Sequence, residues 1–525
     1  MNYAEICIIK RDGKREDFSI SKIKNAIGKA FHASGIDNED KLIAEITMRV
    51  ISNFVSPTIS VEEIQDLVEK ELMKVRPEVA KKYIIYREWR NTERDRKTQM
   101  KHIMDGIVAI DKNDVNLSNA NMSSHTPAGQ MMTFASEVTK DYTYKYLLPK
   151  KYAEAHQLGD IHIHDLDYYP TKTTTCIQYD LDDLFERGFR TKNGSIRTPQ
   201  SIQSYATLAT IIFQTNQNEQ HGGQAIPAFD FFMAEGVRKT FRKHLKTLTE
   251  FYIEVEGKEP GTEALKKIEE KAYAMTRKDT HQAMEGFIHN LNTMHSRAGA
   301  QTPFSSINYG MDVSPEGRLV MKNVLLATEA GLGGGETPIF PIQIFRVKEG
   351  VNFNLGDPNY DIYRLAIRTS AKRLFPNFSF VDAPFNLQYY RPGHPETEIA
   401  YMGCRTRVMG NVYDPDREIA PRRGNLSFTS INLPRIAIEA NGNVDVFFKV
   451  LQERMELVID QLNERFRIIS NKRVKNFPFL MGEGVWIDSE KLSWNDKVGE
   501  VLKHGTMTIG FIGLAEALVA LRGKH

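Results

Sequence analysis

The chain has 525 residues, of which 41% are hydrophobic and 26% are charged, and 69 Lys and Arg against 67 Asp and Glu give a net charge of only +2. This length provides for a large core and for at least two domains, and the balanced charge argues against a nucleic-acid-coating or acidic-tail protein. The N-terminus lacks a secretory signal and no run of about eighteen apolar residues occurs, so we expect a cytoplasmic protein that binds neither membrane nor nucleic acid.

Three cysteines, Cys7, Cys176 and Cys404, are far apart in the sequence and form no CxxC pair. This spacing argues against structural disulfides and against a cysteine zinc site within the chain. We therefore expect reduced thiols and no metal site.

Residues 5–18 predict a β-hairpin, because a short apolar stretch is followed by an Asp-Gly turn and a second short stretch. From Ser21 the apolar positions follow the spacing of a half-buried helix that stops at Gly35. Further helices are predicted over residues 38–54, 61–74 and 77–98. Ser60 and Glu63 form a capping box at the start of the second of these.

Residues 87–101 are rich in Lys and Arg and lack an apolar stripe. This composition is typical of a solvated helix end that leads into a linker. We place a domain boundary near residue 100.

Lys10, Arg11 and Lys22 bring three cations to the hairpin turn and to the start of a helix. Such a cluster suits a triphosphate, although a Lys-Arg-Asp-Gly turn alone is also typical of an exposed hairpin. Residues 1–95 as a whole resemble the ATP-cone domain, through Ile9 to Gly13, Lys22-Ile23, Ile59 to Ile64 and Tyr83 to Arg87. The resemblance implies a small α+β domain, a hairpin plus helices, that binds ATP and dATP as allosteric effectors.

Past residue 100, a helix is predicted over 134–157, and His162 and His164 follow on one face of a strand. Such a pair suits the first two ligands of a metal-dependent hydrolase built on a barrel. Further metal ligands at a recognisable spacing are not evident. Hydrogen bonding at the strand end is the favoured interpretation.

The remaining chain alternates strands and helices, which predicts an α/β barrel-like domain. Cys176 lies in a β-branched stretch, 173–179, that predicts a strand. Gly333 to Gly335 lack the Lys-Ser/Thr of a phosphate loop and predict a tight turn into a strand. Helices are predicted over 198–216, 227–255, 262–296, 358–374 and 444–470. Residues 299–308 predict a loop that leads into a strand. A strand with its loop is predicted over 400–412, and a further strand over 426–432.

Cys404 lies in the stretch Tyr401 to Thr406, which precedes the polar and then apolar segment 424–434. Cysteine is among the most buried residue types, so packing is the ordinary explanation for a single cysteine. The other motifs of the chain favour chemistry instead.

Residues 100–525 resemble the catalytic subunit of the anaerobic, glycyl-radical ribonucleoside triphosphate reductases. The motifs that carry the resemblance are His162 to Asp167, the Cys176 strand, Gly299 to Phe304, Gly356 to Asp361, Met402 to Arg405, Asn425-Leu426 with Asn432 to Arg435, and Gly510 to Gly513. The resemblance implies a ten-stranded α/β barrel over residues 100–525 that follows the ATP cone and reduces ribonucleoside triphosphates to deoxyribonucleotides.

The resemblance also implies roles for five residues. Cys404 carries the transient thiyl radical that removes the 3′ hydrogen, and Cys176 donates hydrogen to the other face of the ribose. Asn425 and Met402 match the formate-dependent subgroup. Thr406 stands where related enzymes have a catalytic glutamate, so formate is expected to supply the carboxylate as co-substrate.

The family implies a radical SAM iron–sulfur activating enzyme as partner and a homodimer or larger assembly. Its zinc site and glycyl radical lie in a C-terminal region that this sequence does not match. We expect this chain alone, as a truncated form, to bind nucleotides without turnover. Two alternatives remain open: a nucleotide-sensing binding protein that uses only the ATP cone, and the hydrolase that uses His162 and His164.

Overall fold

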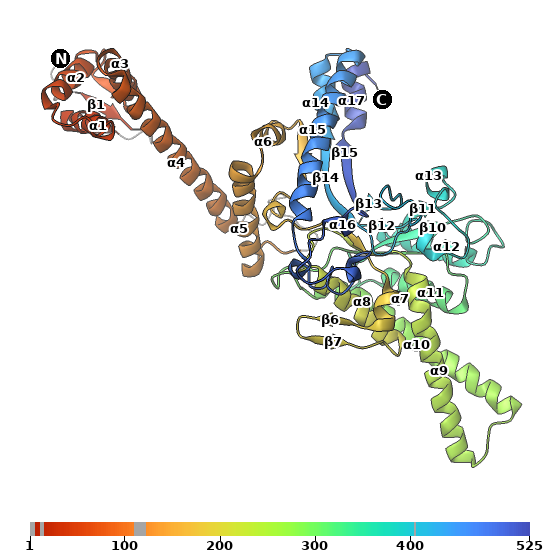
Figure 1. Ribbon diagram of the computed structural model, residues 1–525. Helices are drawn as coiled ribbons and strands as arrows, with labels where there is room; N and C mark the ends of the chain where they lie inside the picture. Colours follow the sequence, from red (N-terminus) through yellow and green to blue (C-terminus); the bar gives the residue numbers. More distant parts are fainter. Residues whose placement is uncertain (1–5, 11–14, 110–121, 404–405, 525) are drawn as a thin grey trace. The chain divides into compact units, whose positions relative to one another are not determined.

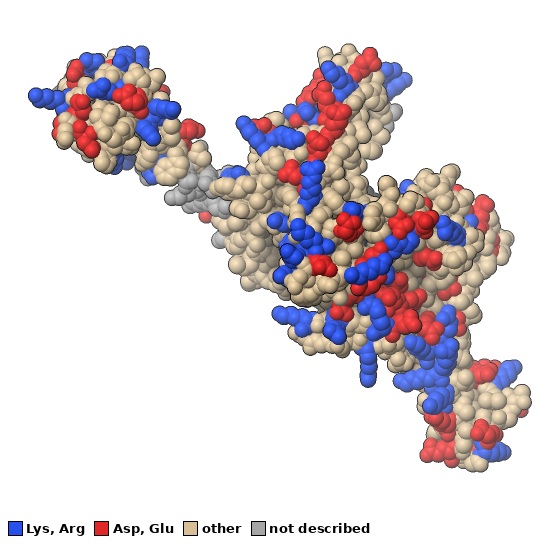
Figure 2. All heavy atoms as spheres, in the orientation of Figure 1, with Lys and Arg blue, Asp and Glu red and all other residues tan. Residues whose placement is uncertain are grey.

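The computed structural model describes residues 6–10, 15–109, 122–403 and 406–524, with the side chains of residues 93–103 and 108–109 left aside. The chain divides into two compact units, residues 1–109 and 110–525, and Figure 1 traces both. Among the described residues, no helix is both long enough and apolar enough to cross a membrane. Basic and acidic side chains lie interspersed on the visible face (Figure 2), in keeping with the small net charge.

Unit 1 combines a three-stranded sheet with four helices. Its elements are β1 (Cys7–Ile9), β2 (Arg15–Asp17), α1 (Ile20–Ala33), α2 (Asp40–Ser52), β3 (Thr58–Ser60), α3 (Val61–Val75) and α4 (Pro77–Ala109). Strand β1 pairs antiparallel with β2 and parallel with β3. The helices bury their apolar stripes around Ile27, Ile46 and Leu72. The predicted hairpin and the predicted Ser60–Glu63 capping box are both present.

Helix α4 continues to Ala109, past the predicted end near residue 98, so the boundary predicted near residue 100 falls inside this helix. Neither Gly nor Pro interrupts residues 87–101, and Arg, Glu and Lys are good helix formers. The prediction of a solvated end is also wrong for Arg87. Its guanidinium forms ion pairs with Glu62, Asp66 and Glu69 of α3, at 2.5, 2.6 and 2.8 Å.

Unit 2 contains a five-stranded parallel sheet in the order β11-β10-β9-β8-β5. A second sheet has the order β15-β14-β4, in which β14 is parallel to β15 and antiparallel to β4. The strands are β4 (Ile161–Ile163), β5 (Ile177–Gln178), β6 (Phe189–Thr191), β7 (Gly194–Ile196), β8 (Gln224–Ile226), β9 (Ser305–Tyr309), β10 (Ile342–Val347), β11 (Asn377–Phe380), β12 (Tyr401–Met402), β13 (Thr406–Arg407), β14 (Asn425–Asn432) and β15 (Thr506–Ile512).

The helices of unit 2 are α5 (Pro127–Tyr142), α6 (Lys150–Gln157), α7 (Leu181–Arg187), α8 (Ile202–Asn216), α9 (Phe229–Glu256), α10 (Thr262–Thr293), α11 (Pro315–Ala330), α12 (Tyr360–Arg373), α13 (Pro384–Leu387), α14 (Leu433–Ala440), α15 (Val444–Ser470), α16 (Gly499–Leu502) and α17 (Leu514–Arg522). The helix predicted over 134–157 is interrupted: a π-helical turn follows α5, and Pro149 precedes α6. Proline cannot donate the hydrogen bond of a helix interior.

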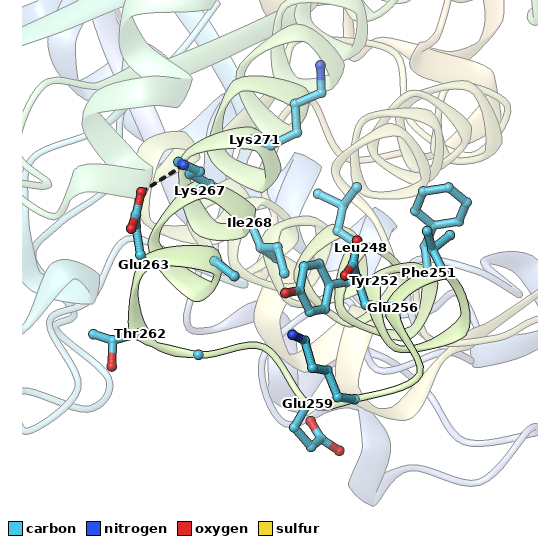
Figure 3. Close-up of a pocket in the computed structure, with 14 residues that line it drawn as sticks. Leu248, Phe251, Tyr252, Glu256, Glu259, Thr262, Glu263, Lys267, Ile268 and Lys271 are labelled. Carbon is cyan, nitrogen blue, oxygen red and sulfur yellow. Dashed lines mark hydrogen bonds and ion pairs between the residues drawn. The ribbon is translucent and has the colours of Figure 1, made fainter.

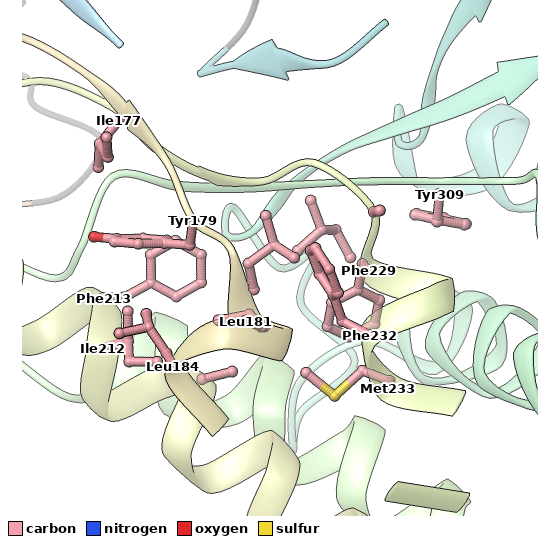
Figure 4. Close-up of a cluster of buried hydrophobic side chains, with 14 of the residues drawn as sticks. Ile177, Tyr179, Leu181, Leu184, Ile212, Phe213, Phe229, Phe232, Met233 and Tyr309 are labelled. Atoms are coloured by element: carbon pink, nitrogen blue, oxygen red, sulfur yellow. The ribbon is translucent and has the colours of Figure 1, made fainter. Parts of the chain in front are cut away.

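The main core of unit 2 lies between the parallel sheet and its covering helices (Figure 4). Tyr309 on β9, Phe213 on α8 and Phe229 on α9 are fully buried there. Strand side chains alternate between two faces, so Ile307 and Tyr309 face this core while Ser306 and Asn308 belong to the opposite face. That opposite face receives the hairpin of β12 and β13.

Backbone hydrogen bonds connect the two sheets beside β5. The N–H groups of Thr175 and Cys176 donate to Asn425 O at 3.0 Å each, and Gln178 N–H donates to Arg423 O at 3.0 Å. These bonds continue the parallel sheet onto the start of β14. This α/β arrangement agrees with the predicted fold class. The barrel count of ten strands stays a prediction, because the described strands form a five-stranded and a three-stranded sheet.

Candidate active site

Cys176 lies immediately before β5 and is buried, with 6% of its surface exposed. The regular ladder begins only at Ile177, so the predicted strand over 173–179 is shorter than expected. The backbone before it is still held, because Gly222 N–H donates to Thr175 O at 2.7 Å and Cys176 N–H donates to Asn425 O. Cys176 shares one buried apolar cluster with Ala225, Met402 and Val408.

A short hairpin carries the other predicted catalytic residues. Strands β12 and β13 pair antiparallel, with Met402 opposite Thr406. Met402 is 1% exposed and Thr406 is half-buried. Cys404 lies outside the described residues and follows Gly403 in the sequence. The structure thus brings Met402 next to Cys176, and the hairpin that contains Cys404 begins at this cluster.

Asn425, the first residue of β14, completes the group and is fully buried. Its Nδ2 donates to Thr508 Oγ1 at 2.9 Å and to Thr506 O at 3.2 Å, while its Oδ1 has no hydrogen-bond partner among the described residues. No motif in the sequence marks Thr506 and Thr508 as partners of Asn425. Their i, i+2 spacing on a strand is a signal that both face one neighbour, but it does not identify the neighbour.

A polar cluster lies beside the segment that leads to Cys176. His221 Nδ1 is 2.7 Å from Thr173 Oγ1, and the ring stacks on Tyr168 with centroids 5.2 Å apart. Arg297 lies over the Tyr168 ring, with its guanidinium carbon 5.1 Å from the ring centre, and it donates a hydrogen bond to the Tyr168 hydroxyl. Burial lowers the pKa of His221 well below its usual value, and Arg465 and Arg297 lower it further. His221 is therefore neutral at physiological pH, and the sequence analysis missed it.

Three buried charged side chains meet close to the start of the hairpin segment. Arg346 of β10 lies 2.6 Å from a Glu398 oxygen and 3.5 Å from an Asp230 oxygen. The other Asp230 oxygen accepts the backbone N–H groups of residues 310–312. Burial raises the pKa of Glu398 to about 8 and Asp230 adds to the rise, although Arg346 lowers it.

His162 and His164 lie with ring centres 4.6 Å apart at the end of β4. The His164 Nε2 is 2.9 Å from Ser430 Oγ of the neighbouring strand, and its ring lies 3.9 Å from the Phe428 ring. Within the described residues, no group of three or more His, Cys, Asp or Glu side chains is arranged to hold a metal ion. The contact of His164 with Ser430 agrees with the interpretation that this pair forms hydrogen bonds at the strand end.

In unit 1, the predicted nucleotide-binding cations converge on one acid. Glu16 of β2 pairs with Lys22 at 2.6 Å and with Lys10 at 2.9 Å. Hydrogen bonds from Lys22 and then Lys10 lower the pKa of Glu16 to about 2. Arg11 lies outside the described residues. A triphosphate at this position would compete with the Glu16 carboxylate for both ammonium groups.

A pocket of about 920 Å³ lies away from all these residues, between the far ends of α9 and α10 (Figure 3). Its walls include Phe251, Tyr252 and Ile268, with the Lys267–Glu263 ion pair at its rim. None of the predicted site residues lines it. This pocket is therefore separate from the candidate active site.

Two family models match the chain. One, described as anaerobic ribonucleoside-triphosphate reductase, matches residues 118–525, and the other, the ATP cone domain, matches residues 6–92. Anaerobic ribonucleoside-triphosphate reductases of Haemophilus influenzae and Escherichia coli are each 32% identical over 98% of this chain, which covers 71% and 70% of their lengths.

Solved structures of anaerobic ribonucleotide reductases share the fold of this chain. The crystal structure of the anaerobic ribonucleotide reductase from Thermotoga maritima in complex with dATP and CTP has a TM-score of 0.51 at 15% identity. That match covers 80% of this chain and 65% of the Thermotoga chain, so this chain spans about two thirds of its length.

Proposed function

This chain belongs to the anaerobic ribonucleoside-triphosphate reductase family, and we propose that it carries the substrate-binding and hydrogen-transfer part of such an enzyme. The proposed reaction converts ribonucleoside triphosphates to 2′-deoxyribonucleoside triphosphates. The observation that supports it most is the buried cluster that joins Cys176 to Met402, beside Asn425 and at the base of the hairpin of Cys404.

We assign the two cysteines to opposite faces of the ribose. Cys404 as a thiyl radical takes the hydrogen from C3′ and returns it at the end. At C2′ the bond to oxygen breaks, the hydroxyl leaves as water, and Cys176 supplies the hydrogen of the new C–H bond. Formate is oxidised to carbon dioxide and supplies two electrons, and one proton is consumed. Thiols suit both tasks because their hydrogen is easily removed and returned.

Burial supports this assignment, because radical chemistry needs exclusion of water and of competing hydrogen donors. Cys176 and Met402 are nearly inaccessible to solvent. Asn425 holds its amide nitrogen toward β15, which leaves Oδ1 to accept a hydrogen bond from a ribose hydroxyl or from protonated formate. Thr406 has no carboxylate, so formate occupies the role that a glutamate has in related enzymes.

We further propose that ATP and dATP act on unit 1 as allosteric effectors, through Lys10, Arg11 and Lys22. The ATP cone match and the two ammonium groups on Glu16 support this. A cytoplasmic location, a radical SAM activating enzyme and a homodimeric assembly are part of the same proposal.

The glycyl radical and the zinc site belong, in this proposal, to the portion of the relatives that this chain does not cover. Such a glycyl radical would supply the radical character that we assign to Cys404.

The test is anaerobic turnover by a chimera that joins this chain to the C-terminal portion of the Escherichia coli relative. With activating enzyme and labelled formate, we expect equal amounts of deoxyribonucleotide and labelled carbon dioxide. Cys404→Ser and Cys176→Ser should each reduce the rate by at least about a thousandfold, since each removes an essential hydrogen carrier. A chimera with an intact glycyl radical signal and no deoxyribonucleotide product would contradict the proposal.

A further inference from the structure

The hairpin that carries Cys404 is too short to fix its own position. Its two strands, β12 and β13, have only two residue pairs, Tyr401 with Arg407 and Met402 with Thr406. An isolated two-stranded hairpin is marginal in water even when it is longer. The neighbouring strand β9 must therefore supply much of what holds it.

We propose that Asn308 and Ser306 of β9 are positioning residues that fix the register of this hairpin up to Gly403, the residue before Cys404 in the sequence. The contacts themselves are independent of any activity, and only their catalytic consequence rests on the proposed function. Asn308 and Ser306 are two residues apart on a strand, so both side chains lie on the same face of the sheet.

Asn308 pairs with the backbone of Tyr401 through both ends of its amide. Tyr401 N–H donates to Asn308 Oδ1 at 2.8 Å, and Asn308 Nδ2 donates to Tyr401 O at 2.9 Å. The side-chain amide thus takes the place of a peptide group in a strand pair. Nδ2 also lies 3.4 Å from Ile226 O of β8, so the amide spans from the sheet to the hairpin.

Ser306 makes the second connection, one pair further along. Gly403 N–H donates to Ser306 Oγ at 3.0 Å, and this hydroxyl donates in turn to Gln224 O at 3.2 Å. Both functions of the hydroxyl are used, one toward the sheet and one toward the hairpin. Gly403 is the residue directly before Cys404.

The hairpin backbone packs closely against its neighbours at Gly403. Gly403 has φ +62°, and a Cβ there would lie 3.1 Å from the Phe304 ring. From the other side, a Cβ on Gly223 would lie 3.2 Å from Gly403 N. Glycine at both positions lets the hairpin backbone approach β8 and β9.

The register matters because side chains of a strand alternate in direction. A slip by one residue would turn Met402 away from Cys176. Hydrogen transfer requires the reacting atoms within about 3–3.5 Å, so a slipped register loses much of the rate. Asn308 and Ser306 hold Tyr401 and Gly403 on either side of Met402.

Hydrogen exchange of the full chain, read by mass spectrometry at the amides of Tyr401 and Gly403, tests this inference. Asn308→Ala should accelerate exchange at Tyr401 tenfold or more, and Ser306→Ala should do so at Gly403. Asn308→Asp keeps the acceptor for Tyr401 N–H but loses the donor, so its exchange should be intermediate.

Asn352→Ala is the matched control. Asn352 is equally buried and its Nδ2 donates to Gly310 O and Arg346 O at 2.8 Å each, but these partners lie outside the hairpin. This variant should leave exchange at Tyr401 and Gly403 unchanged.

Unchanged exchange in both β9 variants, or equal acceleration by Asn352→Ala, would overturn the inference. If Asn308→Ala does not fold, the smaller change Ser306→Ala decides. No turnover is needed, so a negative result here leaves the proposed reductase function standing, and an inactive chimera leaves this inference standing.

Discussion

Glu398 is the residue whose environment makes the clearest pH prediction. Burial, with a smaller contribution from Asp230, raises its pKa from the ordinary value of 4.5 to about 8 in the folded chain, although Arg346 opposes the rise. The folded chain therefore holds a proton that the unfolded chain releases. Its contribution to stability is complete below pH 4.5 and is lost as the pH rises through about 8.

We expect the free energy of unfolding of unit 2 to fall by about 1 kcal/mol per pH unit between pH 5 and 8 from this group. Glu398→Gln should remove that part of the slope. Urea unfolding followed by tryptophan fluorescence measures it, since Trp486 is fully buried in unit 2. Glu396→Gln, two residues earlier and half-exposed, is the control and should keep the slope. An unchanged slope in Glu398→Gln would show that the group is ionised in the folded chain.

The sequence predicts a set of candidate site residues, but it does not predict the contacts that orient them. Cys176, Met402 and Asn425 were identified by their motifs, and the structure places them together. Thr508 was not identified, because it contacts Asn425 across 83 positions of sequence. His221 was missed for the same reason: its partner Thr173 is 48 residues away, and no local pattern marks the contact.

At the scale of elements, the junction of β5 with β14 is the feature that positions Cys176. A Cβ on Gly424 would lie 1.8 Å from Cys176 O, so the two backbones approach more closely than any other residue allows. Glycine is required here for close approach.

Gly424→Ala should therefore destabilise unit 2 by several kcal/mol, since the clash is with backbone and cannot be relieved by a rotamer change. Gly286→Ala in α10 is the matched control: outside the backbone of its own helix, no atom lies within 4 Å of the Cβ that alanine would add, and alanine favours a helix by about 1 kcal/mol. Thermal unfolding should show a large loss for the first variant and no loss for the second. Equal midpoints would mean that the junction is not close-packed in solution.

Element prediction worked where the signal was local and periodic. The Ser60–Glu63 capping box and long helices such as α9 and α15 follow directly from spacing. Strands β11 and β15 were not predicted, since strands gain much of their stability from neighbouring strands that sequence periodicity does not reveal. Helix α4 extends past its predicted end near residue 98 because neither Gly nor Pro interrupts residues 87–101 and Arg, Glu and Lys favour a helix.

At the scale of the whole molecule, each of the two units has its own core and its own proposed ligand. Titration of the full chain with ATP should show a site that Lys10→Ala and Lys22→Ala weaken by about tenfold each, because each removes a charge-assisted hydrogen bond. Lys41→Ala, an exposed lysine on α2, should leave the affinity unchanged. If Lys10→Ala and Lys22→Ala bind ATP as tightly as the control Lys41→Ala, Lys10 and Lys22 do not bind the triphosphate.

The proposal that Cys176 and Cys404 flank one ribose is tested most directly by cross-linking the reduced chain with dibromobimane, which bridges thiols a few ångströms apart. We expect a Cys176–Cys404 bridge in the peptide map, formed more slowly when a ribonucleoside triphosphate and formate are present, with Cys7 modified only singly. Alkylation of both thiols without any bridge between them would contradict the two-cysteine site.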